Sequence, residues 1–556
     1  MLFILFCWAL ISFIFFIIGF GVVRIINLAA KKSFVSSDFG IEEYFFSGFL
    51  VLSMVAGILS LLIPINNVLL IIIGIAALII LLLNYRDIAI IFKSFIGESR
   101  DYAKWPLYIF IFISLFILTA LVHEIEISDT ALYHTQCIKW IRSYPVVPGL
   151  GNIHGRFAFN SMFFVISALF TFQINDSVIY PLNGLCFIFL VVKLVKLIYR
   201  GIKSKNSFEI ALSTVVILVC FNILIRWLNS PSPDTICTTL IIYTFLYFLD
   251  ISRNENLSKA HIILLNLLVF TCAVYKLSAV FMVLLIIPFW KKSILKGMLL
   301  SSLIGIVVVL PFFIRNYFLS GYLVYPFPAI DIFNVDWKIP MERVIDEKAW
   351  IVSWARMPGK PYGEVLGLPF TQWCGPWLDS INDFIMVIMG VNLASFILMI
   401  FMIARKEYNY LIIMLVLIAN YTFWFLNAPD PRFIYGILIF NFSFAIAYIV
   451  LMININSFSG FLKYSKIVFA VILIFIAFRF KSYPIHTIRH PNLWLLSTAM
   501  EKPETDTKSA GFTYRVSLAD RKCYNSEIPC TPFPLSNVVL RGSDISEGFK
   551  VVNEPK

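Results

Sequence analysis

The sequence predicts an all-α integral membrane protein built as a bundle of many membrane-spanning helices. Of its 556 residues, 60% are hydrophobic and only 14% are charged, and the mean hydropathy is +0.88. Apolar runs such as MLFILFCWALISFIFFIIGFGVV, which opens the chain, reach the length of about 20 residues that a bilayer requires. This composition excludes a soluble globular protein.

Fourteen segments are apolar and long enough to be candidate spans. We expect the first to be retained, because no basic residue precedes it and no small-residue cleavage site follows it, as a removable signal peptide would require. The candidate spans are 2–26, 46–64, 66–83, 106–123, 178–198, 210–228, 235–250, 261–275, 277–290, 295–317, 382–403, 409–426, 432–452 and 465–479.

Lysines and arginines gather in alternate connections between these spans, whereas the connections NSPSPDT and NAPDP contain none. Because basic loops stay in the cytoplasm, both termini are expected to be extracytoplasmic. The net charge of +12 is explained in this way, so we predict a lipid bilayer and no nucleic acid as a partner. The basic residues are Arg24, Lys31, Lys32, Arg86, Lys93, Arg100, Lys104, Arg200, Lys203, Lys205, Arg253, Lys259, Lys291, Lys292, Lys296, Arg405, Lys406, Lys463 and Lys466.

The segment FAFNSMFFVISALFTFQ, residues 157–173, does not fit this alternation. It is apolar but short, and a crossing here would place the basic run YRGIKSKN outside. We therefore expect an interfacial or re-entrant helix, with an ordinary fifteenth span as the alternative.

Three regions are expected on the outer side of the membrane: the loops 124–176 and 318–381, and the polar tail 480–556. In an oxidising compartment, Cys523 and Cys530 of CYNSEIPC are expected to form a disulfide, the alternative being two reduced thiols. The chain thus divides into additional N-terminal spans with a cytoplasmic loop (1–104), a transmembrane core (105–479) and a C-terminal extracytoplasmic region (480–556).

The first outer loop opens with EISDTALYHTQCIKWIRSYP, an unusually polar stretch directly after a span. With Ser128 as N-cap, a helix is expected to run to about residue 143. Helical spacing then places four side chains on one face: Asp129, Tyr133, Gln136 and Trp140. A carboxylate in a first helical turn suits a base or a metal ligand, and the alternative is that Asp129 only caps the helix.

Other charged residues stand at the expected outer ends of helices. Asp234 lies in SPSPDT, and Lys276 lies between two closely spaced spans in TCAVYKLSAVF. Three arginines share this placement: Arg226, Arg315 and Arg432. Cations at outer helix ends run against the positive-inside tendency, and a phosphate-bearing lipid headgroup would account for them. The alternative is that each side chain snorkels to the interface.

The stretch SDTALYHTQCIKWI after a span resembles the first outer loop of GT-C-type glycosyltransferases, in which an aspartate precedes a tyrosine by four positions. In that superfamily the aspartate is the catalytic carboxylate, so the resemblance implies this role for Asp129. SPSPDT resembles the acidic second outer loop and implies a catalytic Asp234. VYKLSAVF and DPRFIYGILIF are similar to the superfamily's lysine between two spans and to its arginine-aromatic start of a late span, which points to Lys276 and Arg432. The loop 318–381 fits the variable acceptor-side loop.

The resemblance covers roughly residues 105–450 and is closest to uncharacterised bacterial polytopic membrane proteins that share a run like YHTQCIKWIRSYPVVPGLGNIHGRFAFNS. Where better-known members have a His-Pro-Pro run, this chain has IHGRFAFN. The expected substrate-binding residues are Tyr133, Trp140, His154, Arg156, Arg226, Lys276, Arg315 and Arg432.

The resemblance implies a GT-C-like bundle in a bacterial inner membrane that moves a sugar from a polyprenyl-phosphate-linked donor to a glycan, lipid or protein acceptor, with inversion, at the periplasmic face. The chemistry requires a base for the acceptor and positive charge for the phosphate leaving group. No metal site is expected, although His123, Glu124 and Glu126 leave Mg²⁺ or Mn²⁺ as an alternative source of that charge. The rival functions are a polysaccharide polymerase or ligase, which would rest on Arg343 and Arg356, and a lipid-linked sugar flippase or transporter without catalysis.

Overall fold

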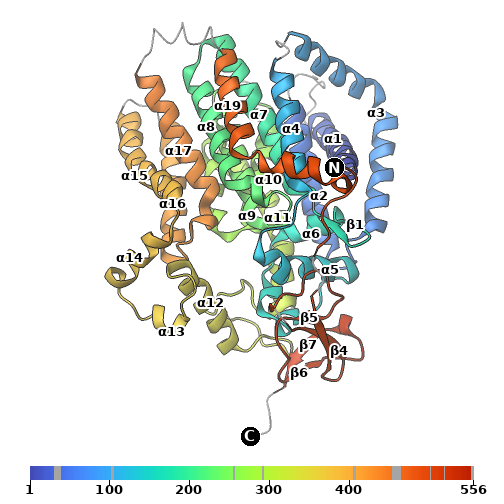
Figure 1. The fold of residues 1–556 in the computed structure, drawn as a ribbon. Helices are drawn as coiled ribbons and strands as arrows, with labels where there is room; N and C mark the ends of the chain where they lie inside the picture. The colour runs from blue at the N-terminus through green and yellow to red at the C-terminus, as the bar shows by residue number, and fades with distance from the viewer. Residues whose placement is uncertain are drawn as a thin grey trace.

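The structure is a computed structural model that describes residues 1–29, 39–101, 105–254, 257–290, 293–404, 409–453, 465–500, 503–518 and 520–552. Most of these residues form long helices that lie side by side, and a smaller region of short helices and strands gathers at one end of the bundle (Figure 1). Eight of the basic residues named above lie outside the described ranges: Lys31, Lys32, Lys104, Lys291, Lys292, Arg405, Lys406 and Lys463.

Ten helices in the described ranges are long and apolar enough to cross a membrane, and each coincides with a predicted span. This confirms an all-α protein with several apolar membrane-length helices. The ten helices are α1 (Leu2–Ala29), α2 (Ile41–Leu59), α3 (Asn67–Asp101), α7 (Leu182–Ser204), α8 (Ser207–Leu224), α9 (Pro233–Ser252), α11 (Ile294–Ser320), α15 (Asp383–Ala404), α16 (Asn409–Asn427) and α17 (Tyr435–Met452).

The other four predicted spans are also helical, but they are shorter or bent. They are α4 (Trp105–Leu121), α10 (Lys259–Tyr275), the 3₁₀ helix η5 (Leu277–Trp290) and α19 (Ser465–Arg479). After α19 the chain bends by 58° into α20 (Ser482–Arg489), and the two pass the length and hydropathy criteria for a span only as a pair.

The first two helices touch through their backbones. A Cβ atom on Gly19 of α1 would lie 1.9 Å from the carbonyl oxygen of Tyr44, and one on Gly48 of α2 would lie 1.9 Å from that of Phe15. Small residues at a crossing allow helices to approach this closely, which is the usual way in which helices associate where no water drives them together.

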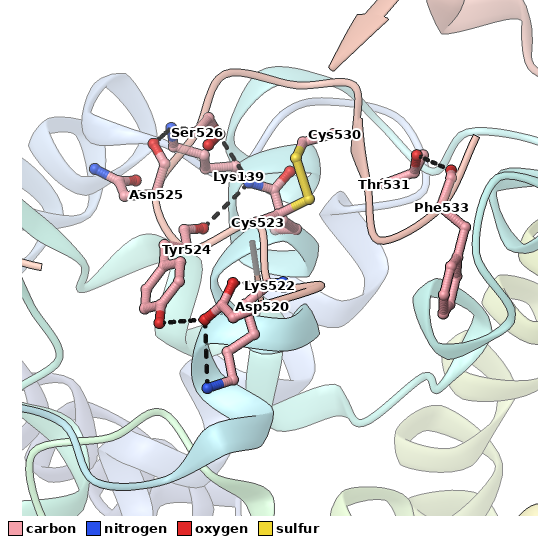
Figure 2. Close-up of a disulfide and its surroundings, with 11 residues drawn as sticks. Lys139, Asp520, Lys522, Cys523, Tyr524, Asn525, Ser526, Cys530, Thr531 and Phe533 are labelled. Carbon is pink, nitrogen blue, oxygen red and sulfur yellow. Dashed lines mark hydrogen bonds and ion pairs between the residues drawn. A yellow bond between two sulfur atoms is a disulfide. The ribbon is translucent and has the colours of Figure 1, made fainter. Parts of the chain in front are cut away.

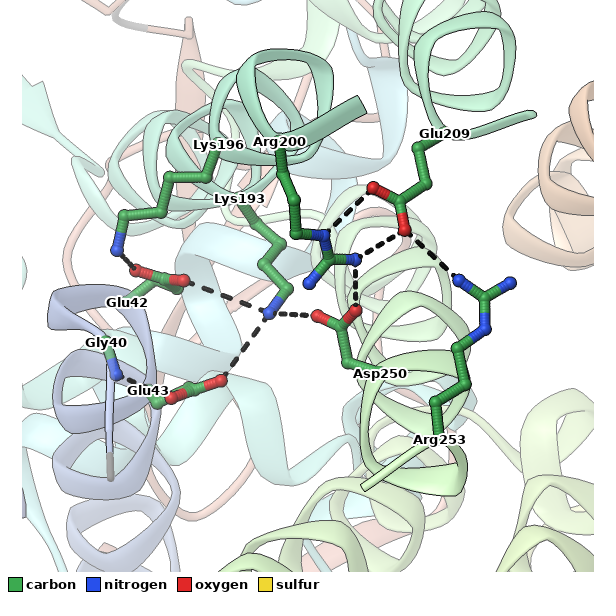
Figure 3. Close-up of polar contacts among 9 residues, drawn as sticks. All are labelled: Gly40, Glu42, Glu43, Lys193, Lys196, Arg200, Glu209, Asp250 and Arg253. Carbon is green, nitrogen blue, oxygen red and sulfur yellow. Dashed lines mark hydrogen bonds and ion pairs between the residues drawn. The ribbon is translucent and has the colours of Figure 1, made fainter. Parts of the chain in front are cut away.

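A network of charged side chains joins α2, α7, α8 and α9 at the end of α9 remote from Asp234 (Figure 3). The Lys193 ammonium lies 2.6 Å from Asp250 and 3.5 Å from Glu43, and Lys196 lies 2.6 Å from Glu42. The network is completed by Arg200, Glu209 and Arg253. Buried charges are tolerated when they are paired, so this network holds α2 against the core helices without an unpaired ion.

The first outer loop folds into short elements. They are the π-helix η1 (Thr130–His134), α5 (Thr135–Ser143), the 3₁₀ helices η2 (Leu150–Asn152) and η3 (Gly155–Ala158), α6 (Met162–Leu169), and the antiparallel strands β1 (Phe172–Ile174) and β2 (Ser177–Ile179). The predicted helix in 157–173 is therefore α6, whose eight residues are all buried. Eight residues rise only about 12 Å against a bilayer core of about 30 Å, so the alternative of a fifteenth span is wrong. Since α6 packs against α2, α5 and α10, it lies inside the protein.

The second outer loop contains α12 (Met341–Arg356), α13 (Tyr362–Val365) and α14 (Phe370–Ser380). The tail contains the 3₁₀ helices η7 (Pro491–Trp494) and η8 (Ile545–Glu547) and two small sheets. In the first sheet, β4 (Thr513–Ser517) pairs antiparallel with β3 (Thr505–Ser509) and parallel with β5 (Cys530–Thr531). In the second, β6 (Val538–Leu540) pairs antiparallel with β7 (Phe549–Val551), with Val539 opposite Lys550.

The tail packs directly on the first outer loop. Cys523 and Cys530 form the predicted disulfide, and the loop between them lies on α5 (Figure 2). Lys139 of α5 donates to the carbonyl oxygens of Asn525 and Ser526 at 2.6 and 2.9 Å. The Phe549 amide donates to the Pro148 carbonyl at 2.9 Å. An ion pair at 2.9 Å between Arg541 and Asp336 links the tail to the second outer loop, so all three predicted outer regions gather at one end of the bundle.

Candidate functional site

Asp129 does not cap the helix in which it lies. Ser128, the predicted N-cap, is itself helical, so the helix begins one residue earlier than predicted, and the chain continues through η1 into α5. The backbone of Asp129 has φ −60° and ψ −27°, and its carboxylate accepts no hydrogen bond from the first turn. The alternative that Asp129 serves only as a cap is therefore wrong.

The Asp129 carboxylate instead lies between two guanidinium groups from distant parts of the chain. Arg156 of η3 donates to one carboxylate oxygen at 3.2 Å, and Arg432 lies 3.9 Å from the other. These three side chains are 31%, 34% and 32% exposed, respectively. The arrangement is a charged centre that remains open to a ligand.

Arg432 is oriented by Asp430, two residues earlier in the chain. The Asp430 carboxylate accepts hydrogen bonds at 2.9 Å from both the Arg432 backbone amide and its guanidinium. Asp430 is thereby the N-cap of the 3₁₀ helix η6 (Pro431–Ile434), which leads into α17. A side chain that caps its own turn fixes the direction in which the next residues point.

Asp234 and Lys276 form a second ion pair beside the first. Asp234 lies in the first turn of α9, and Lys276 is the one non-helical residue between α10 and η5, as its place between two predicted spans indicated. The Lys276 ammonium lies 4.1 Å from the ring centroid of Phe433, and the Arg432 guanidinium lies 5.8 Å from the same ring. The two pairs therefore meet at Arg432 and Phe433.

Glu347 of α12 also reaches the site and was missed from the sequence. Its carboxylate lies 3.7 Å from the Arg156 guanidinium. A Cβ on Gly155 would lie 2.8 Å from this carboxylate and 2.9 Å from the Tyr325 hydroxyl, so only glycine lets η3 approach them. Burial raises the pKa of Glu347, and the positive charge of Arg156 opposes that rise. The only signal in the sequence was an acid in an amphipathic segment, which carries no motif.

The half-buried Tyr133 and the buried His134 follow Asp129 in the same helical segment. The Tyr133 ring lies 5.8 Å from the Arg156 guanidinium, and burial together with the charge of Asp129 raises the pKa of Tyr133. His134 is buried, and this lowers its pKa to about 4, although the charges of Asp129 and Asp234 oppose the shift. The imidazole and the phenol near Asp129 are therefore both neutral at neutral pH.

The prediction that Gln136 and Trp140 share a face with Asp129 is wrong. The π-helical segment η1 adds residues to a turn and rotates α5 relative to an ideal α-helix. As a result, Trp140 is buried with its ring centroid 6.0 Å from that of Phe549 in the tail. Gln136 donates to the carbonyl oxygens of Tyr524 and Ser526 at 3.2 and 2.9 Å. Both residues hold the tail and lie away from the charged site.

Three other predicted site residues lie outside the cluster of Asp129, Arg156, Asp234, Lys276, Glu347 and Arg432. Arg315 is buried and donates to Asn160 at 3.1 Å and to the Ser60 hydroxyl at 3.0 Å, which ties α11 to the end of α2. His154 packs on Phe157, and burial lowers its pKa to about 3. Arg226 is exposed and lines a different groove.

The structure does not bring His123, Glu124 and Glu126 together as a set of ligands for a metal ion. In the described part of the chain, no three His, Cys, Asp or Glu side chains come close enough together to hold an ion. A ring nitrogen of His123 instead lies 3.2 Å from the Tyr483 carbonyl oxygen. The positive charges beside Asp129 come from arginine and lysine side chains.

No curated protein and no solved structure matches the chain. A family described as "Domain of unknown function (DUF8201)" matches residues 1–439. This match begins in α1, ends in α17 and includes all six residues of the cluster defined above. The chain belongs to the DUF8201 family.

Proposed function

We propose that the protein is a membrane glycosyltransferase of the GT-C type that moves a sugar from a polyprenyl-phosphate-linked donor to a glycan, lipid or protein acceptor. The observation that carries this proposal is the Asp129 carboxylate, which caps no helix and lies open between Arg156 and Arg432. The six charged groups of the cluster come from both outer loops and from helix ends, at the same end of the bundle as the tail.

In the proposed reaction, Asp129 is the general base. It takes the proton from the acceptor hydroxyl as that oxygen bonds to the anomeric carbon of the sugar. The bond from the anomeric carbon to the phosphate oxygen breaks, and its electron pair stays on the leaving polyprenyl phosphate. Arg432 and Arg156 supply positive charge next to this developing anion. Attack on the face opposite the leaving group inverts the anomeric centre.

Asp234 and Lys276 have a supporting part in this proposal. The Asp234 carboxylate is less exposed than that of Asp129, 21% against 31%, and its contact with Lys276 is closer than either contact of Asp129 with an arginine, so it is less available as a base. The ammonium of Lys276 also lies on Phe433, next to Arg432. We therefore assign the pair to positioning Arg432, and Lys276 to a contact with the phosphate when the donor binds.

The proposal includes a bacterial inner membrane crossed fourteen times, with the cluster on the periplasmic side. It is supported by the match between all fourteen predicted spans and observed helices, ten of which have membrane length alone. It is also supported by the disulfide in the tail, because disulfides persist outside the cytoplasm. A donor carried by a lipid suits a site at the ends of membrane helices, where no nucleotide sugar is present.

The rival functions receive less support from the described contacts. A polymerase or ligase would need Arg343 and Arg356 in the site, but the Arg343 guanidinium lies 3.5 Å from the carbonyl oxygens of Asn152 and Ser536. The Arg356 guanidinium lies 4.8 Å from the Trp373 ring centroid. A transporter would place its polar residues midway along broken helices, whereas Asp234 and Arg432 lie at helix starts.

The test begins with cells that carry or lack the gene, whose glycans and lipid-linked intermediates identify the donor and the acceptor. Transfer is then measured with purified protein in nanodiscs, together with the melting temperature. Asp129→Asn keeps the size of the side chain but removes the base, so the rate should fall by on the order of 10²–10⁴. The matched control is Asp346→Asn, an exposed acid on α12 outside the cluster. Wild-type turnover by a folded Asp129→Asn variant would overturn the proposal.

A further inference from the structure

Arg226 lies in a groove that is separate from the cluster around Asp129. It belongs to the 3₁₀ helix η4 (Ile225–Trp227) at the end of α8, and Arg479 at the end of α19 lines the same groove. The groove has a volume of about 540 Å³, and its other lining residues include His123, Glu126, Tyr483 and His486. None of the six cluster residues lines it.

The two arginines differ from the cations of the cluster in having no carboxylate partner among the residues that the structure describes. Arg156, Lys276 and Arg432 each form an ion pair. Within the described ranges, neither Arg226 nor Arg479 forms an ion pair or a hydrogen bond with another side chain, and both are exposed to the groove. A planar guanidinium offers several donors in a fixed fork that matches phosphate oxygens. The groove therefore presents two guanidinium groups whose hydrogen-bond donors are free to bind phosphate, although that of Arg479 also lies 5.9 Å from the Phe480 ring centroid.

The remaining polar groups of the groove leave an excess of positive charge. Glu126 is the one acid among the described residues that line it. The His123 and His486 rings lie 4.6 Å apart, and the His486 ring stacks on that of His490 at 4.1 Å. Two arginines against one carboxylate give a net positive groove even when all three imidazoles are neutral.

Apolar side chains are exposed directly beside this groove. The chain bends by 58° after α19 and then runs across the bundle towards the N-terminus (Figure 1). On the two sides of the bend, Phe478, Ile485 and Ile488 are 75%, 42% and 65% exposed. A bent helix with basic ends and an exposed apolar face is the usual form of a segment that lies at a membrane interface. The apolar face is suited to acyl chains and the groove to a headgroup.

We propose that this groove binds the phosphodiester headgroup of an anionic phospholipid, with Arg226 and Arg479 as the phosphate ligands. The acyl chains lie along Phe478, Ile485 and Ile488. This lipid is distinct from the sugar donor, because the groove lies apart from Asp129 and lacks its residues. An anionic lipid would then occupy the groove whenever the folded protein is in its membrane, whether or not the protein is a glycosyltransferase.

The test is lipid binding by the purified full chain in detergent, followed by native mass spectrometry during titration with phosphatidylglycerol or phosphatidylcholine. Wild-type protein should retain phosphatidylglycerol preferentially. Arg226→Gln with Arg479→Gln should weaken its binding by about tenfold, because charge-assisted hydrogen bonds are lost, and should leave phosphatidylcholine binding unchanged. The matched control is Arg489→Gln, an exposed arginine on α20 that does not line the groove.

Further experiments distinguish which kind of molecule supplies the bound phosphate group. If the double glutamine variant does not fold, Arg226→Lys with Arg479→Lys keeps the charge but loses the fork and should bind with an intermediate affinity. Inorganic phosphate at millimolar concentration should not displace phosphatidylglycerol, because it lacks acyl chains. Equal binding of the two phospholipids, unchanged affinity in both double variants, or stronger competition by phosphate or by polyprenyl phosphate than by phosphatidylglycerol would each overturn the proposal.

Discussion

The Asp129 carboxylate accepts its hydrogen bond from Arg156, 27 residues further along the chain, at 3.2 Å. The same guanidinium lies 3.7 Å from Glu347 in the second outer loop. Arg156 therefore joins the start of the first loop to α12, and the position of the proposed base depends on a residue that also holds the other loop. Loss of this arginine should therefore displace Asp129 and lower the activity without unfolding the protein.

Replacement of Arg156 should misplace Asp129 and lower the activity without destabilising the fold. Arg156→Gln should lower kcat by on the order of 10², as expected when a catalytic group is misplaced by about 1 Å, with little change in melting temperature. Arg156→Lys keeps the positive charge and should recover part of that loss. The measurement is kcat and KM with the donor and acceptor that the cell-based experiment identifies. Equal rates for the glutamine and lysine variants would contradict a role for the charge of Arg156.

The ion pair of Asp234 and Lys276 should contribute to the free energy of unfolding, which can be measured without an activity assay. The two side chains are 21% and 16% exposed, so removal of either partner leaves a largely buried charge. Asp234→Asn and Lys276→Met should each lower the free energy of unfolding by about 1–3 kcal/mol. The double variant should be more stable than the sum of the single effects predicts, because no charge is left unpaired. Denaturation in one detergent measures all four proteins, and strictly additive effects would contradict the coupling.

Much of the fold could be predicted from the sequence because each apolar run long enough to span a bilayer leaves its own local signal. Two of the helices that were found shorter or bent, α10 and α19, stop at the basic residues Lys276 and Arg479, which interrupt the apolar run. Lys276 was placed correctly between two helices for the same reason. The sequence could also suggest Asp129, since a charged residue directly after a span is conspicuous.

The remaining features of the site depend on contacts between distant segments. The π-helical segment η1 has no signature in TALYH, yet it rotates Gln136 and Trp140 towards the tail. Glu347 approaches Arg156 only because α12 folds back over η3, which periodicity within the loop cannot reveal. Arg226 and Arg432 looked equivalent as cations at helix ends, but packing placed one in an open groove and the other beside Asp129.

The sidedness of the bundle can be checked with fusion reporters. A reporter after Lys205, in the connection between α7 and α8, should be active in the cytoplasm. Reporters after Gly321 and at the C-terminus should be active only in the periplasm, because both outer loops and the tail lie at one end of the bundle. A cytoplasmic signal from the C-terminal fusion would contradict the proposed location of Asp129 and of the disulfide.

Glu347 should give the protein a measurable dependence of stability on pH. Burial raises the pKa of its carboxyl above the ordinary value of 4.5, to which it returns in the unfolded chain. Between these two pKa values the folded protein binds more protons than the unfolded chain. The free energy of unfolding should therefore fall as the pH rises through this window, and the loss should be complete above the raised pKa.

Glu347→Gln removes this titration while keeping a side chain of the same shape against Arg156 and Gly155. Its free energy of unfolding should lack the decline that wild type shows above pH 4.5, so the difference between the two proteins should grow with pH and then level off. Unfolding in one detergent between about pH 4 and pH 8 measures it, with Glu342→Gln on the same helix as a control for the loss of a carboxylate. Parallel curves for wild type and Glu347→Gln would mean that the carboxyl is not desolvated in the folded protein. It would also mean that α12 does not approach η3 closely in the protein, because that approach is what buries Glu347.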